Sequence, residues 1–190
     1  MRISALAPIT GLLMTVLLPL STQAAPYTID QEQSSIGFAG THADTPFNGT
    51  FKEWTASIDF DATQLEKSSI SAEFTLKSAH TGNAMYDGTL PQGDWFNVKE
   101  HPVGVFKSDT VTHKGDNLYH VTGKLTLRGI TQDIAFDFIL SDPSANPVKV
   151  NATFPIDRLA FDIGKKSDDK AEWVSQEITL SIELSATKAE

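Results

Sequence analysis

Apolar and polar residues alternate along most of the chain that follows residue 26. Residues 70–76 place apolar side chains at every even position, and residues 134–140 repeat this pattern. A period of two is typical of β-strands that bury one face, whereas the apolar residues of an amphipathic helix recur every three or four positions. The same alternation covers residues 121–127, 148–156 and 178–184. The sequence therefore predicts an all-β fold.

Short turn signals separate the alternating segments, so we expect antiparallel hairpins. The parity of the apolar positions, that is, whether the apolar residues have odd or even numbers, changes from odd to even between residues 29 and 36. It changes from odd to even again between Phe51 and Trp54. The second change predicts a bend near Lys52 and Glu53. We predict eight strands, at about residues 27–41, 46–61, 68–79, 103–113, 118–128, 131–141, 147–156 and 173–185.

Eight antiparallel strands that share one apolar face are predicted to close into a barrel, because closure covers that face and removes the sheet edges. Two segments lack alternation. Residues 81–102 are expected to form short helical turns across the mouth of the barrel, and residues 157–172, which include Asp168, an exposed charged loop. An eight-stranded barrel is either filled by its own side chains or holds one slender ligand. The alternation alone favours the packed core.

The first 25 residues have the order of a secretory signal peptide. Arg2 precedes an apolar run that ends at Pro19, and small residues follow up to Ala25. We expect cleavage after Ala24, because cleavage one residue later would place Pro26 at the first mature position. Residues 1–24 are then the signal peptide and residues 25–190 one exported domain. The apolar run is too short to span a bilayer comfortably, so no stable membrane insertion is expected.

Composition and motif spacing exclude several functional classes. The formal net charge of -9 argues against nucleic acid as a partner, and the chain has no cysteine for redox, thiolate or Cys-ligated metal chemistry. The 5 histidines lack His-x-His or His-x-x-x-His spacing, and there is no phosphate loop, dinucleotide fingerprint or Gly-x-Ser-x-Gly motif. The acidic pairs Asp133 with Asp137 and Asp168 with Asp169 are expected to be solvated. We therefore predict no catalytic residue, no metal site and no cofactor.

The segment GKLTLRGIT at residues 123–131 follows the pattern Gly-x-Leu-Thr-x-x-Gly-x-Thr, and the chain also contains YTID at 27–30, SIGF at 35–38, DWFN at 94–97 and FDIG at 161–164. These segments resemble motifs of the YceI-like family of exported lipid-binding proteins. The most specific is the one at residues 123–131, which is similar to a hairpin of that family. The resemblance implies a lipocalin-like antiparallel barrel in the periplasm, with short helical caps. It also implies a hydrophobic tunnel that holds an isoprenoid such as a polyprenyl phosphate or a quinone.

The resulting prediction is a periplasmic protein that binds or carries a long-chain amphiphilic lipid and has no enzymatic activity. Two alternatives stay open: an exported protein-interaction module with a solid core, and an enzyme that acts on an isoprenoid. The sequence does not fix the oligomeric state, and a homodimer stays open. The residues predicted to contact the tail are Phe38, Phe51, Phe74, Leu76, Phe106, Phe138, Phe154 and Leu180, with Met85, Trp95 and Phe96 as the cap and His42 at the head group.

Overall fold

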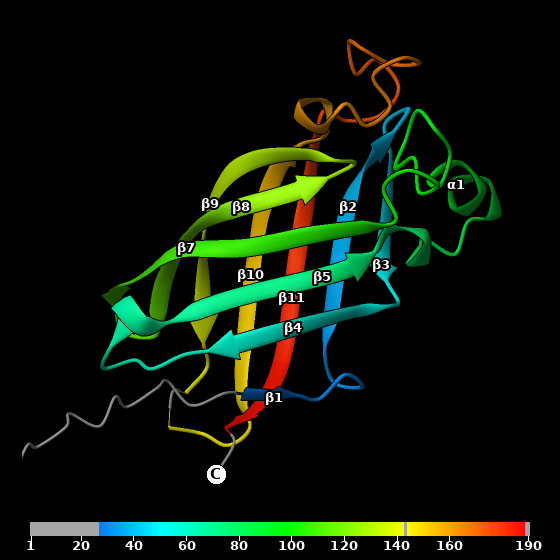
Figure 1. Cartoon of the computed structure of the whole chain (residues 1–190). Coiled ribbons are helices and arrows are strands. Elements are labelled where there is room, and N and C mark those ends of the chain that lie inside the picture. Colours follow the sequence, from blue (N-terminus) through cyan, green and yellow to red (C-terminus); the bar gives the residue numbers. More distant parts are fainter. Residues whose placement is uncertain (1–26, 143, 189–190) are drawn as a thin grey trace, which may run out of the picture.

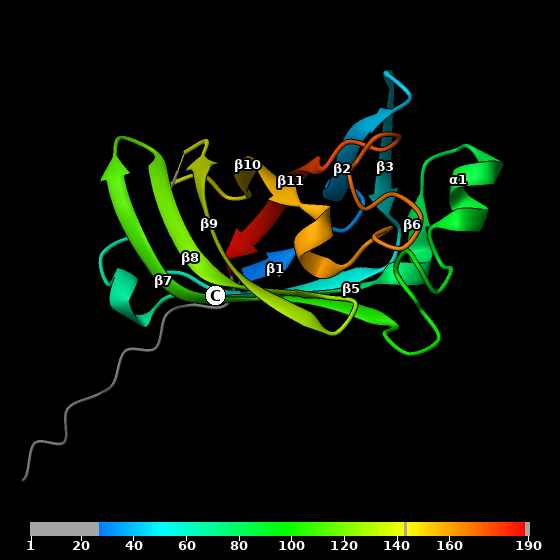
Figure 2. The ribbon, with the colours of Figure 1, turned by 90° about the horizontal axis from the view of Figure 1, so that it is seen from above.

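The computed structural model describes residues 27–142 and 144–188, so the signal peptide predicted over residues 1–24 lies outside the described part. One antiparallel sheet curls around a single interior, as Figure 1 and Figure 2 show from two directions. The hydrogen-bonded strand order is β4-β5-β7-β8-β9-β10-β11-β2-β3-β6, and β1 pairs with β11. The predicted lipocalin-like all-β fold is confirmed.

The described part of the chain holds eleven strands and four short helices. None of these helices is long and apolar enough to cross a membrane. The helices are η1 (Leu65–Lys67), η2 (Leu76–Ser78), α1 (Ala84–Thr89) and η3 (Arg158–Phe161). The strands are β1 (Tyr27–Ile29), β2 (Ser35–His42), β3 (Thr45–Phe51), β4 (Trp54–Asp59), β5 (Ser69–Thr75), β6 (Ala79–His80), β7 (Val103–Gly115), β8 (Leu118–Leu127), β9 (Ile130–Leu140), β10 (Val148–Asp157) and β11 (Glu177–Lys188).

Three of the eight predicted strands are interrupted. The first divides into β1 and β2 and the second into β3 and β4, in both cases where the parity of the apolar residues changes. The third ends at Thr75, because η2 turns the chain before the two-residue strand β6. The last predicted strand is displaced: it begins at Glu177 rather than at residue 173, and it continues to Lys188, which pairs with Tyr27 of β1.

The corner between β3 and β4 connects the two ends of the hydrogen-bonded strand order, which are β4 and β6. The backbone N–H of Lys52 donates to the carbonyl oxygen of Ser78 at 3.2 Å, and the N–H of Glu53 donates to Ser78 Oγ at 3.0 Å. The N–H of Thr75 donates to the carbonyl oxygen of Glu53 at 2.9 Å. These bonds tie the start of β4 to the segment that leads into β6, so the bend predicted at Lys52 and Glu53 brings the two sides of the curled sheet together.

Aromatic rings cover much of the inner face of the sheet. Phe136 of β9 stacks on Phe154 of β10, with ring centroids 4.0 Å apart and an interplanar angle of 7°. Gly104 of β7 lets the ring of Phe74 lie against the backbone, because a Cβ at Gly104 would sit 2.3 Å from Phe74 Cε2. The interior is therefore bounded by large, stiff apolar side chains.

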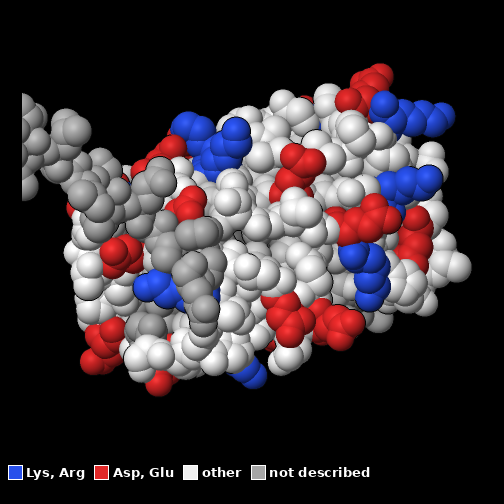
Figure 3. Space-filling model, turned by 60° about the horizontal axis from the view of Figure 1, so that its bottom comes forward, with Lys and Arg blue, Asp and Glu red and all other residues white. Residues whose placement is uncertain are grey.

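The outer face carries charged residues, as the alternation predicts. Asp133 Oδ1 lies 2.6 Å from Lys124 Nζ, and Asp137 accepts from Lys114 at 2.8 Å and contacts His120 at 2.6 Å. Figure 3 shows acidic and basic side chains interspersed with uncharged ones over the face in view. Exposed pairs of this kind contribute little to stability, so the inner face must supply most of it.

Candidate functional site

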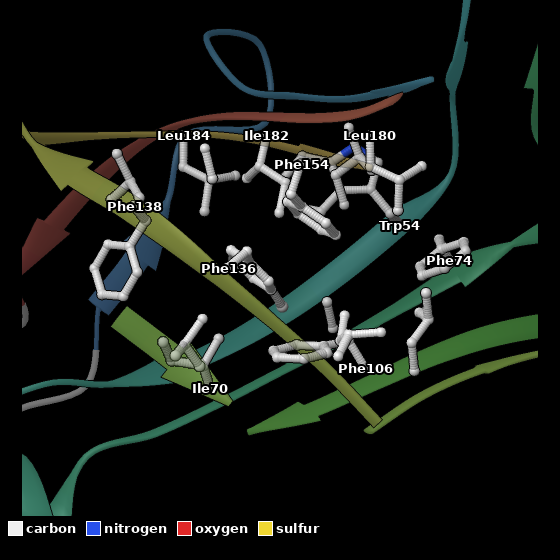
Figure 4. Close-up of a pocket in the computed structure, with 18 of the residues that line it drawn as sticks. Trp54, Ile70, Phe74, Phe106, Phe136, Phe138, Phe154, Leu180, Ile182 and Leu184 are labelled. Carbon is white, nitrogen blue, oxygen red and sulfur yellow. The ribbon is translucent and has the colours of Figure 1, made fainter. Parts of the chain in front are cut away.

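The interior of the curled sheet contains a large apolar cavity. Its volume is about 370 Å³, far above the roughly 10–15 Å³ that a single water needs. Phe106, Phe136 and Phe154 point into its middle from three different strands (Figure 4). Nearly all of the lining is apolar, so water inside would find few hydrogen-bond partners. The interior is thus a cavity and not the packed core that the alternation alone favours.

Nine of the twelve residues predicted to contact a lipid line this cavity, and their contact with a ligand stays a prediction. Leu76 does not line it; this side chain is fully buried in η2, where the chain leaves β5. Met85 on α1 and His42 on β2 line a second, smaller cavity instead. The nine that the structure brings together are Phe38, Phe51, Phe74, Trp95, Phe96, Phe106, Phe138, Phe154 and Leu180.

Several lining residues were not singled out from the sequence, although the alternation marks them as inward-facing. Phe136 lies at the centre of the cavity, and Trp54 and Ile70 face it from β4 and β5 (Figure 4). Ile182 and Leu184 of β11 complete the opposite wall. Parity alone would have found all of them, because each lies on the apolar parity of its strand.

The few polar residues of the lining gather at the two ends of the cavity. One end, beside β1 and the C-terminal end of β11, holds Tyr27, Asp61, Thr63 and Lys188. Burial, followed by the charge of Asp61, raises the pKa of the Tyr27 phenol above its usual value. The other end, at η3 near the top of Figure 1, holds Arg158, the first residue of that helix. A tail in this cavity would therefore lie between two polar ends along an apolar middle.

Arg158 is a buried cation whose donors are used within the protein. Its side chain is 2% exposed. Its Nε donates to the carbonyl oxygen of Ser175 at 3.1 Å, and Nη1 donates to that of Ile163 at 2.7 Å. Its Nη2 donates to Asp168 Oδ2 at 2.7 Å and to the carbonyl oxygen of Val174 at 2.9 Å. The guanidinium therefore fixes the segment that follows β10 across the end of the cavity.

The prediction that residues 157–172 form an exposed loop with a solvated Asp168 is wrong for this carboxylate. The side chain of Asp168 is 6% exposed and pairs with Arg158. Its Oδ1 accepts from the N–H of Glu172 at 2.8 Å, and its Oδ2 accepts from the N–H of Val174 at 2.9 Å. The charge run predicted solvation because Lys165, Lys166 and Asp169 surround Asp168 in the sequence; a partner ten positions away in the chain cannot be found from a local pattern.

Acid should remove the contribution of Asp168 to stability. Burial raises the pKa of this carboxyl, but three backbone N–H donors and Arg158 outweigh burial and hold the pKa below its usual value. A carboxyl with a lowered folded-state pKa stabilises the fold above its unfolded pKa of about 3.9, and this contribution is lost as the pH falls further. Denaturant melts of the wild type and Asp168→Asn should therefore differ most at neutral pH and converge below about pH 4. A difference that stays constant down to strong acid would contradict this assignment.

The second cavity lies beside α1 and has a volume of about 190 Å³. It shares Phe47, Leu90, Trp95 and Val174 with the lining of the main cavity, so these four residues border both spaces. Its other lining residues are His42, Thr81, Met85, Tyr86 and Thr89.

α1 is held in place by a side-chain cap and by a contact with β2. Asn83 Oδ1 accepts from the N–H groups of Met85 and Tyr86, which starts the helix. His42 Nδ1 lies 3.0 Å from Tyr86 Oη, and the two rings meet edge to face. The segment 81–102, predicted to form short helical turns, thus contains one six-residue α-helix that covers the side of the barrel near β2 and β3.

Comparison with known proteins identifies the family of this chain. The model of the YceI-like domain matches residues 27–186, and the chain belongs to this family. A UPF0312 protein of Pseudomonas syringae pv. syringae is 33% identical over 127 residues, which are 65% of this chain and 66% of the relative. A UPF0312 protein of Vibrio parahaemolyticus is 32% identical over 131 residues, 67% of this chain and 69% of the relative. The match thus spans slightly less than two thirds of the Pseudomonas relative's length.

Solved structures share the curled sheet. BcnA of Burkholderia cenocepacia superposes with a TM-score of 0.80 at 26% identity, over 84% of this chain and 100% of that one. The YceI protein of Campylobacter jejuni gives 0.66 at 26% identity, over 75% and 85% of the two chains. A domain of Saccharophagus degradans described as polyisoprenoid-binding gives 0.67 at 16% identity, over 88% and 100%. The last likeness concerns the fold alone.

Proposed function

We propose that this protein binds and carries an amphiphilic lipid whose long apolar tail, of the isoprenoid class, occupies the main cavity. The observation that carries the proposal is an apolar space of about 370 Å³ in the interior of the sheet. Transfer of a tail from water into such a space gains about 0.8 kcal/mol per buried methylene. A cavity bounded by rings and β-branched side chains is selective for the width of the tail, because these side chains have few rotamers.

The lining favours binding over chemistry. The ionisable groups that line the main cavity in the described residues are Tyr27, Asp61, Arg158 and Lys188, and they lie at its ends. Arg158 is engaged by the carboxylate of Asp168 and by four backbone carbonyls, while Asp61 accepts hydrogen bonds from its neighbour Thr63. The apolar middle offers no group that could transfer a proton to a tail. The cavity also counts against an interaction module with a solid core.

Mass spectrometry of organic extracts tests the proposal directly. The protein should be purified from its native compartment without detergent, so that a lipid bound in the cell stays bound. We expect about one long-chain isoprenoid lipid per protein chain in the extract. Recovery of no apolar compound from the wild type, together with no uptake of added isoprenoid lipids by the delipidated protein, would refute the carrier function.

Export to the periplasm belongs to the same proposal. The order of charged, apolar and small residues over residues 1–25 supports it. We expect the stable protein recovered from the periplasm to begin at Ala25, and N-terminal sequencing measures this. An intact Met1 on the stable protein would contradict export through a cleaved signal peptide.

A further inference from the structure

Two large apolar side chains are exposed beside the second cavity. Met85 on α1 and Trp173 are each 62% exposed, more than any other large hydrophobic residue in the described part of the chain. Met85 lines the second cavity, and Trp173 directly precedes Val174, which lines both cavities. Figure 1 and Figure 2 show α1 and the segment that ends at Trp173 at the same end of the barrel.

The backbone of Trp173 is fixed although its indole is exposed. Its carbonyl oxygen accepts from the N–H of Ala43 at 2.8 Å, and its own N–H donates to Asp168 Oδ1 at 3.2 Å. The next residue, Val174, forms a bridge with His42 of β2. Single exposed apolar residues are common on protein surfaces, but a tryptophan is large and on average well buried. The contacts that close this end of the main cavity therefore also hold an indole in the solvent.

The charges of the segment that leads to Trp173 are balanced. Residues 158–173 are neutral as a group, whereas the whole chain carries a formal net charge of -9. The lysines of this segment are exposed, and their long apolar stems can lie along an apolar surface while the ammonium groups stay in water. The basic residues are Arg158, Lys165, Lys166 and Lys170, and the acidic residues are Asp162, Asp168, Asp169 and Glu172. This segment can therefore approach a lipid surface without the repulsion that the acidic remainder of the chain would meet.

The area of this patch fits a lipid surface better than a protein partner. A buried aromatic side chain covers about 150–250 Å², whereas a stable protein interface takes about 800 Å² from each partner. Two side chains fall well short of that area. Tryptophan is enriched at membrane–water interfaces, where its ring lies against apolar chains and its N–H stays hydrated. Adsorption of this kind requires no segment that spans the bilayer.

We propose that Met85, Trp173 and the lysines of residues 165–170 form a surface with which the protein adsorbs reversibly to a lipid bilayer. The purpose of this surface rests on the proposed lipid-binding function. A long-chain lipid that left the bilayer through water would expose its whole tail to water. A protein that adsorbs with the side that holds the second cavity avoids most of this exposure, because the tail passes directly from one apolar environment to another.

Flotation with vesicles tests the surface by itself. The delipidated mature protein is mixed with vesicles of phosphatidylcholine, with or without phosphatidylglycerol, and the floating fraction is measured. We expect the wild type to bind both kinds of vesicle. Trp173→Ser and Met85→Ser should each lower the binding constant roughly 3- to 10-fold, because part of each side chain enters the interface. Ile139→Ser is the control, since this residue is 50% exposed on the outer face of β9, and it should leave binding unchanged.

Transfer of a polyprenol separates adsorption from lipid binding. Uptake from donor vesicles should be slower for Trp173→Ser than for the wild type. Uptake from detergent micelles should be the same for both, because Trp173 lines neither cavity. Ile139→Ser should match the wild type with both donors.

Three results would overturn the adsorption surface. The first is a wild type that does not bind vesicles, and the second is a pair of variants, Trp173→Ser and Met85→Ser, that bind them as well as the wild type does. The third is self-association of the wild type that Trp173→Ser abolishes, without vesicle binding, which would assign the patch to a second copy of the chain. Vesicle binding that depends on Trp173, without polyprenol uptake from either donor, would support the surface and refute the lipid-binding function.

Discussion

Replacing Arg158 by methionine should lower the free energy of unfolding by about 3–5 kcal/mol. The substitution leaves the carboxylate of Asp168 buried without its partner and removes the donors that bond the carbonyl oxygens of Ile163, Val174 and Ser175. A buried charge or carbonyl that loses its partner cannot recover its hydration, so its full desolvation penalty lowers the free energy of unfolding. Urea melts of the ligand-free protein measure the loss.

An ion pair on the outer face provides the matched control. Lys124 Nζ and Asp133 Oδ1 are 2.6 Å apart, close to the 2.7 Å of the buried pair, but both side chains are exposed. Lys124→Met removes a charge in the same way and should change the urea midpoint far less. Combining Arg158→Met with Asp168→Leu should recover part of the lost stability, because no unpaired buried charge remains. An Arg158→Met protein as stable as the wild type would show that packing alone holds this segment.

The long strands and the inward-facing residues could be predicted from the sequence, because register in a half-buried sheet is a local property. Each residue on the apolar parity of β9, from Ile134 to Leu140, faces the interior cavity. The corner at Lys52 and Glu53 was also predictable, since a parity change requires an irregularity between two regular strands. The alternation does not predict the volume of the cavity between the side chains of opposite walls, because this volume depends on the curvature of the whole sheet.

Arg158 was missed although the alternation extends to it. Apolar residues occupy the even positions from 148 to 156, and position 158 continues that parity with an arginine. The rule that charged residues mark solvent was applied to the run around Lys165, and it fails when a buried cation has its own carboxylate and carbonyl partners. A charged residue on the inward parity is the signal that could have indicated this site.

The contact between His42 and Tyr86 could not be predicted from the sequence for a different reason. The two residues are 44 positions apart, and α1 has six residues. A helix this short has no apolar periodicity that would indicate which side it presents to the barrel. Its orientation comes from the Asn83 cap and from the ring contact itself, both of which are tertiary details.

Replacing Phe138 by aspartate should abolish lipid retention. Phe138 lines the main cavity and is 5% exposed. A carboxylate there would have no cationic partner among the apolar side chains around it, and it would oppose entry of an apolar tail. Ile139→Asp is the control: it introduces the same charge one position further along β9, where the side chain is 50% exposed. Lipid recovery after reconstitution should fall to background for the first variant and stay at the wild-type level for the second.

Truncation to alanine then separates loss of binding from loss of folding. A phenylalanine in a packed core destabilises by about 3–5 kcal/mol when it is cut to alanine. Phe138 packs on Tyr119 and Phe60 on one side, with ring centroids 5.4 Å and 6.3 Å away, and borders the cavity on the other. Because atoms that border a void have already lost contacts on that side, Phe138→Ala should destabilise the ligand-free protein by less than this range while weakening lipid binding. Two results together would contradict this: a loss of the full packed-core range of about 3–5 kcal/mol by Phe138→Ala in ligand-free melts, and no lipid bound by the wild type. They would show that the cavity is closed in solution and that the carrier function does not hold.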